Sequence, residues 1–134
     1  LRVRLPWLRA RTDQRRALAS RYRSGLEGAP VRVPLELDPG HVYHLFPVRT
    51  LRRAELQAHL RSAGIDTLVH YPVPIPRQPA FASAASGRWP AAEAAAEQVL
   101  SLPLHPALSM TAVDSVAAAI RAFSGNGGGK ELGS

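Results

Sequence analysis

The residues best suited to binding a polar ligand lie in one proline-rich stretch, residues 69–79. It carries His70, Tyr71, Arg77 and Gln78, whose side chains can donate and accept hydrogen bonds and can pair with an anion. The prolines fix their own φ angles and push each preceding residue to extended geometry. We therefore expect a stiff loop that presents these side chains at low entropic cost. A rigid surface connection, with a packed tyrosine and a satisfied histidine, explains the same residues equally well.

Other catalytic chemistries find little support in the sequence. His41 and His44 are three residues apart in a predicted strand, so they should face opposite sides and not share a metal ion. There is no cysteine, which excludes disulfides and a thiolate nucleophile. The only lysine, Lys130, lies in a glycine-rich tail that offers no scaffold to hold it. We therefore expect no catalytic residue in this chain, and a Schiff-base lysine would have to come from elsewhere.

The composition fits one globular domain with an uneven charge. The chain has 134 residues, of which 46% are hydrophobic and 20% charged. Because no apolar run nears the ~20 residues that span a bilayer, we expect a cytoplasmic protein with no membrane partner. The net charge of +7 arises in residues 1–32, which hold nine arginines and two acids. This basic region suits a nucleic acid, an acidic partner or a phosphorylated ligand, or it reflects only an arginine-rich genome.

The order of predicted elements indicates an α+β fold, a small, mostly antiparallel sheet packed with helices. Hydrophobic periodicity predicts helices over residues 7–26, 51–63, 90–100 and 111–123. It predicts strands over residues 31–37, 41–48 and 65–69, with a short extended piece at 101–106. The first two strands should form a hairpin. Thr50 is the expected cap of the second helix, and Thr111 with Asp114 resembles a capping box for the last one.

We divide the chain into a basic linking helix (1–28), a small C-terminal domain (29–124) and a flexible glycine-rich tail (125–134). Because the chain begins at Leu1 without an initiator methionine, we expect it to be truncated or processed. Isolated from the remainder, it should expose apolar surface and associate with itself.

Three segments together resemble a known family. They are His41–Arg49 (HVYHLFPVR), Gly64–Pro74 (GIDTLVHYPVP) and Val99–Pro106 (VLSLPLHP). The opening helix, with Tyr22, adds to the likeness. In this order and at these intervals, they look like the C-terminal small domain of the DegT/DnrJ/StrS sugar aminotransferases, pyridoxal-phosphate (PLP) enzymes of fold type I. The likeness covers roughly residues 1 to 124.

The resemblance implies a homodimeric enzyme that moves an amino group from glutamate or glutamine to a nucleotide-linked keto-sugar. In that family the cofactor lysine and most PLP contacts belong to a large N-terminal domain, which this chain lacks. By analogy, His70 and Tyr71 approach the sugar nucleotide, Arg77 or Gln78 helps to orient it, and His44 on an inner strand is a second candidate. One departure is Pro76, at a position where many relatives carry a histidine.

Two alternatives stay open from the sequence. A family member that has lost catalysis and acts as a regulator would carry the same residues. A stand-alone, arginine-rich module that binds nucleic acid or another protein through residues 2–23 is the runner-up, although this region lacks the interleaved aromatics of single-strand binders.

Overall fold

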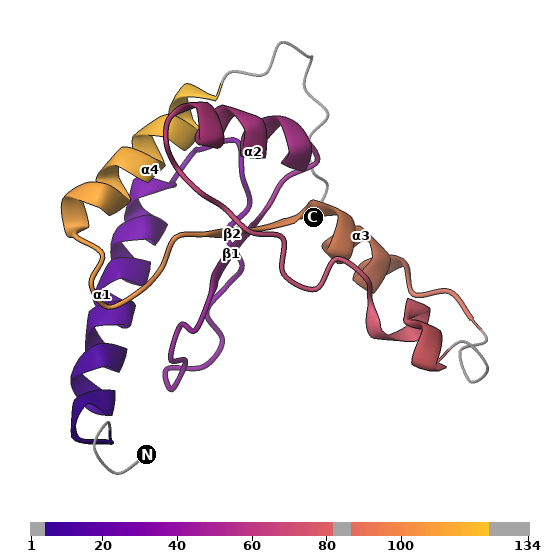
Figure 1. Cartoon of the computed structure of the whole chain (residues 1–134), viewed down its shortest axis with the longest axis horizontal. Coiled ribbons are helices and arrows are strands. Elements are labelled where there is room, and N and C mark those ends of the chain that lie inside the picture. The colour runs from indigo at the N-terminus through magenta and orange to yellow at the C-terminus, as the bar shows by residue number, and fades with distance from the viewer. Residues whose placement is uncertain (1–4, 82–86, 124–134) are drawn as a thin grey trace.

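The computed structural model describes residues 5–81 and 87–123 of the chain (Figure 1). Its α-helices are α1 (Leu8–Gly25), α2 (Arg53–Ser62), α3 (Pro90–Gln98) and α4 (Met110–Ala122). Its strands are β1 (Phe46–Arg49) and β2 (Val99–Leu102), and its short 3-10 helices are η1 (Leu5–Trp7), η2 (Ile75–Arg77) and η3 (Pro79–Phe81). Helices α1, α2 and α4 lie around the two paired strands, whereas α3 and the η2–η3 segment project away as an arm (Figure 1). The tail expected at 125–134 lies outside the described residues.

The sheet is small and antiparallel, as predicted, and the described part of the chain has an α+β fold. Strand β1 pairs with β2 in the register Phe46↔Leu102 to Arg49↔Val99. A single antiparallel bridge flanks the pair on each side: Arg32↔Arg49 beside β1, and Leu68↔Ser101 beside β2. The segments around residues 32, 49, 101 and 68 therefore lie next to one another, although they are far apart in sequence.

The predicted strand over residues 31–37 is wrong, and so is the predicted hairpin. This segment forms only one isolated bridge, between Arg32 and Arg49. Arg32 and Arg49 exchange both of their backbone hydrogen bonds, at 2.8 Å each. In this antiparallel register the next hydrogen-bonded pair would join Pro34 to Pro47. Neither proline has an N–H group, so neither bond can form and the ladder ends after one step.

The other two predicted strands are also shorter than expected. The segment 41–48 becomes extended only at Phe46, because Tyr43 adopts a positive φ of 48° that breaks the strand. The segment 65–69 pairs only at Leu68. Its next partner on one side would be Pro103, which lacks an N–H donor.

The helices occur where they were predicted, but several ends differ. Thr50 is not the N-cap of α2; its hydroxyl instead accepts the backbone N–H of Arg52, which is the capping residue. The N-cap of α4 is Ser109, whose hydroxyl accepts the N–H of Ala112 at 3.1 Å. The predicted capping box is therefore wrong. Helix α3 ends at Gln98 and passes directly into β2, so residues 99 and 100 are strand, not helix.

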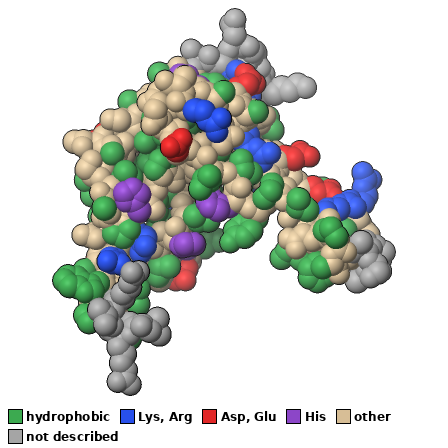
Figure 2. Space-filling model, viewed as in Figure 1, with side chains coloured by type: hydrophobic (Ala, Val, Ile, Leu, Met, Phe, Trp, Pro, Cys, Tyr) green, Lys and Arg blue, Asp and Glu red, His purple; other side chains and the backbone are tan. Residues whose placement is uncertain are grey.

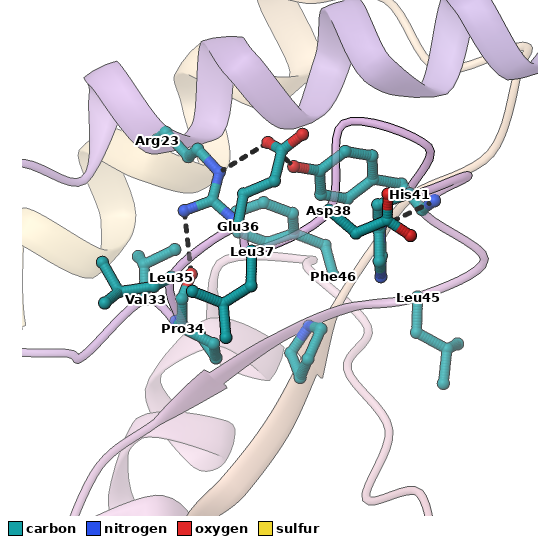
Figure 3. Close-up of a pocket in the computed structure, with 12 residues that line it drawn as sticks. Arg23, Val33, Pro34, Leu35, Glu36, Leu37, Asp38, His41, Leu45 and Phe46 are labelled. Atoms are coloured by element: carbon teal, nitrogen blue, oxygen red, sulfur yellow. Dashed lines mark hydrogen bonds and ion pairs between the residues drawn. The ribbon is translucent and has the colours of Figure 1, made fainter.

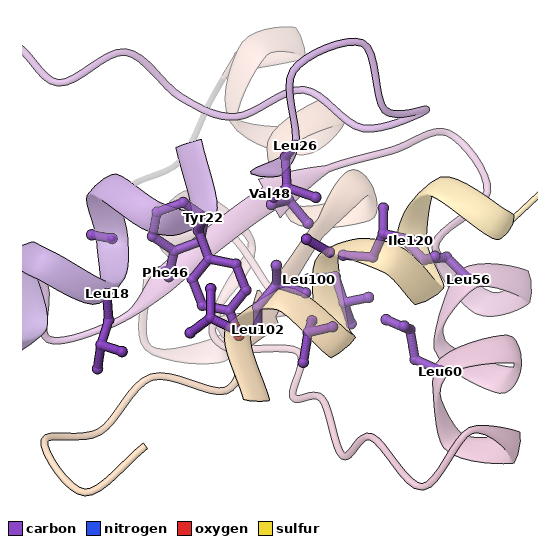
Figure 4. Packing of buried hydrophobic residues seen from close by; sticks show 14 of the residues in the cluster. Leu18, Tyr22, Leu26, Phe46, Val48, Leu56, Leu60, Leu100, Leu102 and Ile120 are labelled. Carbon is purple, nitrogen blue, oxygen red and sulfur yellow. The ribbon is translucent and has the colours of Figure 1, made fainter. Parts of the chain in front are cut away.

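The core forms where α1, α2 and α4 close over the strands (Figure 4). Tyr22 of α1 is fully buried, and its ring stacks on Phe46 of β1 with centroids 4.9 Å apart. Its hydroxyl donates to the carbonyl of Pro103 at 2.9 Å, so one side chain joins α1 to both strands. In contrast, α3 contains no buried residue. Within the described ranges, no helix has the length and apolar character needed to cross a membrane.

Candidate functional site

The His70 side chain is fixed at the point where the proline-rich loop leaves the sheet. The bridge between Leu68 and Ser101 aligns the two backbones, with hydrogen bonds of 2.8 and 3.2 Å. Two residues after this bridge, the His70 ring places Nδ1 at 2.9 Å from the Ser101 hydroxyl. The ring also lines an open pocket of about 190 Å³, which includes Leu45 and Asp66. The structure thus presents one edge of an imidazole to a small, accessible hollow.

Tyr71 lies beside His70 but faces solvent. The side chain is 79% exposed, and its ring centroid is 6.3 Å from that of His70. Its φ angle of 56° is uncommon for a residue with a side chain, and the following Pro72 restricts the chain further. An exposed tyrosine in a constrained backbone is suited to contact with a ligand, because little freedom is left to lose on binding.

Arg77 and Gln78 both belong to the arm, and Arg77 is held against α3. The Arg77 guanidinium donates from Nε to Glu93 Oε1 at 2.7 Å and places Nη2 at 2.6 Å from the same oxygen. It also lies over the Trp89 ring, 5.6 Å from its centroid. Basic and acidic side chains lie next to each other on this arm (Figure 2). Gln78 is half-buried after η2. The pairing of Glu93 with Arg77 could not be read from their spacing in the sequence.

His44 differs from the expectation in one respect. It is exposed and precedes β1 instead of lying on an inner strand. The next residue, Leu45, lines the same pocket as His70, but His44 is not among the residues that line it. The described residues contain no cluster of three potential metal ligands.

A second pocket, of about 230 Å³, opens between α1 and the segment 33–38 (Figure 3). Arg23 donates from Nη1 to the carbonyl of Pro34 at 2.8 Å, and the Tyr43 hydroxyl donates to Glu36. Burial, followed by this hydrogen bond to Glu36, raises the pKa of Tyr43. Sequence reasoning missed this pocket, because its polar groups come from three segments that no local pattern connects.

Several arginines of the basic region hold the protein's own backbone. Arg16 donates to the carbonyls of Pro39 and His41 at 3.0 Å each. Arg21 forms a two-pronged ion pair with Asp114 of α4, at 2.7 and 3.0 Å. Together with the hydrogen bond of Arg23, these contacts fix α1 to its neighbours. Figure 2 shows hydrophobic, basic and acidic side chains interspersed on one face of the molecule. Much of the charge in this helix therefore has a structural use.

The described residues do not fit covalent attachment of PLP. The cofactor is held in such enzymes through the amine of a lysine, and the chain's only lysine, Lys130, lies outside the described residues.

The architecture is that of part of a fold type I aminotransferase, as comparison with solved structures shows. DesV from S. venezuelae superposes with a TM-score of 0.85 and 46% identity over 91% of this chain and 34% of that one. NtdA from Bacillus subtilis, solved with bound cofactor PMP, gives a TM-score of 0.72 and 30% identity, covering 83% of this chain and 28% of NtdA.

Sequence comparison then identifies the family. Residues 1–121 match the model of the DegT/DnrJ/EryC1/StrS aminotransferase family, and the chain belongs to that family. The dTDP-3-amino-3,4,6-trideoxy-alpha-D-glucose transaminase of Streptomyces venezuelae is 48% identical over 125 residues, covering 90% of this chain and 33% of the relative. The chain thus spans about a third of the length of the proteins it matches.

Proposed function

We propose that this chain is the C-terminal small domain of a PLP-dependent aminotransferase acting on a nucleotide-linked keto-sugar, with glutamate or glutamine as amino donor. The observation that carries the proposal is the family match over residues 1–121, combined with relatives that are about three times as long. Several of those relatives are named as transaminases of dTDP- or UDP-linked sugars. The chemistry belongs to residues outside this chain, in a large N-terminal domain that carries the lysine, within a homodimer.

The role of this domain in that enzyme is to bind and orient the sugar nucleotide. His70 lines an open pocket where the loop leaves the sheet, and Tyr71 lies beside it facing solvent. The imidazole nitrogen and the phenol hydroxyl can both hydrogen-bond the oxygens of a sugar. His44, on the segment that precedes β1, is proposed as a second contact to the substrate. The restricted backbone around Tyr71 limits the entropy lost when the ligand binds.

Arg77 and Gln78 are proposed to serve the nucleotide end of the substrate. The ion pair with Glu93 engages Nε and Nη2 of Arg77. Because a guanidinium carries five N–H donors, groups remain on Nη1 for a diphosphate oxygen. Glu93 would then keep the arginine oriented instead of competing with the ligand for it.

The activity can be tested in the reverse direction, with an amino sugar as donor. The full-length protein would be mixed with PLP, dTDP-3-amino-3,4,6-trideoxy-α-D-glucose or a UDP-linked 3-amino sugar, and 2-oxoglutarate. We expect glutamate to form with one of these nucleotide sugars and not with the free amino sugar. Absence of glutamate with every nucleotide sugar, from a protein that binds PLP, would contradict the proposal.

The site itself can be tested by substitution in the same protein. We expect His70→Ala, Tyr71→Phe and Arg77→Ala each to raise KM for the sugar nucleotide by about 3- to 30-fold, as expected for the loss of hydrogen bonds to a ligand. Arg61→Ala is the matched control, because Arg61 is an exposed arginine of α2, on another element. If all three substitutions behave like this control, the loop does not contact the substrate.

A further inference from the structure

Ser101 is a polar residue in an otherwise apolar strand, Leu100-Ser101-Leu102. The residue is only 4% exposed, and its neighbours on both sides are buried core residues. Both of its backbone groups bond to Leu68, and its hydroxyl lies 2.9 Å from Nδ1 of His70. Among the described residues, no other hydrogen-bond partner of this hydroxyl is present. The backbone pairing of Ser101 with Leu68 and the contact of its hydroxyl with His70 therefore both help to fix the position of the His70 ring.

The burial of Ser101 decides which atom donates. If Nδ1–H of His70 donated to the serine, the hydroxyl proton would remain buried without an acceptor, which carries the full desolvation penalty of that donor. If the hydroxyl donates instead, its proton is satisfied and only oxygen lone pairs lack a partner, which proteins tolerate more readily. The hydroxyl therefore donates to an unprotonated Nδ1. A neutral imidazole with an unprotonated Nδ1 carries its proton on Nε2.

We propose that Ser101 is a positioning residue that holds His70 in the Nε2–H tautomer and presents this N–H as a hydrogen-bond donor at the pocket. The group it would recognise is an uncharged oxygen acceptor, such as a hydroxyl or carbonyl of the sugar, so this inference rests on the function proposed above. No hydrogen bond to Nε2 from the described residues is present, which leaves the donor available. Asp66, which lines the same pocket, supplies an acceptor for a neighbouring hydroxyl.

The tautomer can be measured without any substrate. Histidine-selective ¹⁵N labelling of the full-length protein gives the ring nitrogen shifts, and loss of one signal set in His70→Gln assigns them. The spectra would be recorded over a series of alkaline pH values, and the shifts would be read where they no longer change with pH. We expect Nδ1 to have the shift of an unprotonated nitrogen and Nε2 that of a protonated one. A proton on Nδ1 would overturn the proposal.

A double-mutant cycle tests whether Ser101 acts through His70. We expect Ser101→Ala to lower kcat/KM for the amino-sugar nucleotide by about 3- to 10-fold, since one hydrogen bond orients the ring. In the His70→Gln background the same substitution should change kcat/KM by less than about 1.5-fold. Ser115→Ala is the matched control, because this exposed serine lies on α4 and bonds only its own helix. An equal loss in both backgrounds would show a merely structural role and overturn the proposal.

The nitrogen shifts and the double-mutant cycle together distinguish a failure of this inference from a failure of the proposed function. If His70→Gln alone leaves kcat/KM at the wild-type value, His70 does not contact the substrate and the proposed site fails. The nitrogen shifts would still decide whether Ser101 sets the tautomer. If the shifts place the proton on Nδ1 while His70→Gln lowers kcat/KM, the proposed site stands and the role of Ser101 is refuted.

Discussion

Replacing Tyr22 with phenylalanine removes one oxygen from the fully buried centre of the fold. The ring would keep its stacking on Phe46, but the 2.9 Å hydrogen bond to the Pro103 carbonyl would be lost. Pro103 is half-buried, so water can only partly replace the missing donor. We expect the free energy of unfolding to fall by about 1–2 kcal/mol, the sum of a lost hydrogen bond and an incompletely satisfied carbonyl.

Tyr71→Phe is the matched control, because it removes the same atom from a side chain that is 79% exposed. Its free energy of unfolding should stay within about 0.5 kcal/mol of wild type. Urea denaturation followed by circular dichroism measures both variants, with an unchanged slope m showing that only stability has changed. Equal stability of the two variants would refute the conclusion that the Tyr22 hydroxyl joins α1 to the end of β2.

The same substitution has a consequence at alkaline pH. Burial raises the pKa of Tyr22 in the folded protein above its ordinary value of 10. Since the unfolded chain then releases this proton first, the contribution is fully present below pH 10 and is lost as the pH rises further. The Tyr22→Phe protein should therefore lose less stability than wild type between about pH 10 and 11. A shallower but remaining slope is expected, because burial also raises the pKa of Tyr43.

Three further substitutions test how the helices are joined and ended. Arg21 lowers the pKa of Asp114, so this pair contributes stability that is lost as the pH falls below about 3.8. When the free energy of unfolding is measured against pH, Asp114→Asn should lose less stability than wild type below this pH. An equal loss of stability in the two proteins would contradict the prediction. A β-carbon at Gly25 would lie 3.0 Å from that of Ala117, so Gly25→Ala should lower the melting temperature, and an unchanged or higher melting temperature would contradict this. Gly64→Ala has open space but a φ of 74°, so it should cost about 1 kcal/mol in denaturant titrations through backbone strain alone; a neutral result would refute that.

The helices could be predicted because their signals are local. Leu18, Tyr22 and Leu26 repeat at helical spacing, and all three are buried. The ends of the strands could not be predicted in this way. The Pro34–Pro47 opposition that stops one ladder depends on a register between residues far apart in sequence, and no single segment carries it.

The site was partly predictable for the same reason. The prolines pointed to the His70–Tyr71 loop. In the structure His70 lines a pocket, and Tyr71 lies beside it facing solvent. Ser101 was not predicted to belong to the site, although a lone serine between two leucines in an apolar segment indicates a buried hydroxyl with a hydrogen-bond partner. The contact of Arg77 with Glu93 and Trp89 could not be predicted, because it depends on how the η2–η3 segment packs against α3.

The most direct test of the central claim is a crystal structure of the full-length protein with PLP and the amino-sugar nucleotide on which it is active. We expect a sugar oxygen to lie within hydrogen-bond distance of His70 Nε2 or the Tyr71 hydroxyl, with the cofactor bound to a lysine outside this chain. A sugar nucleotide held entirely by residues outside this chain, with the loop at 69–79 turned away, would contradict it.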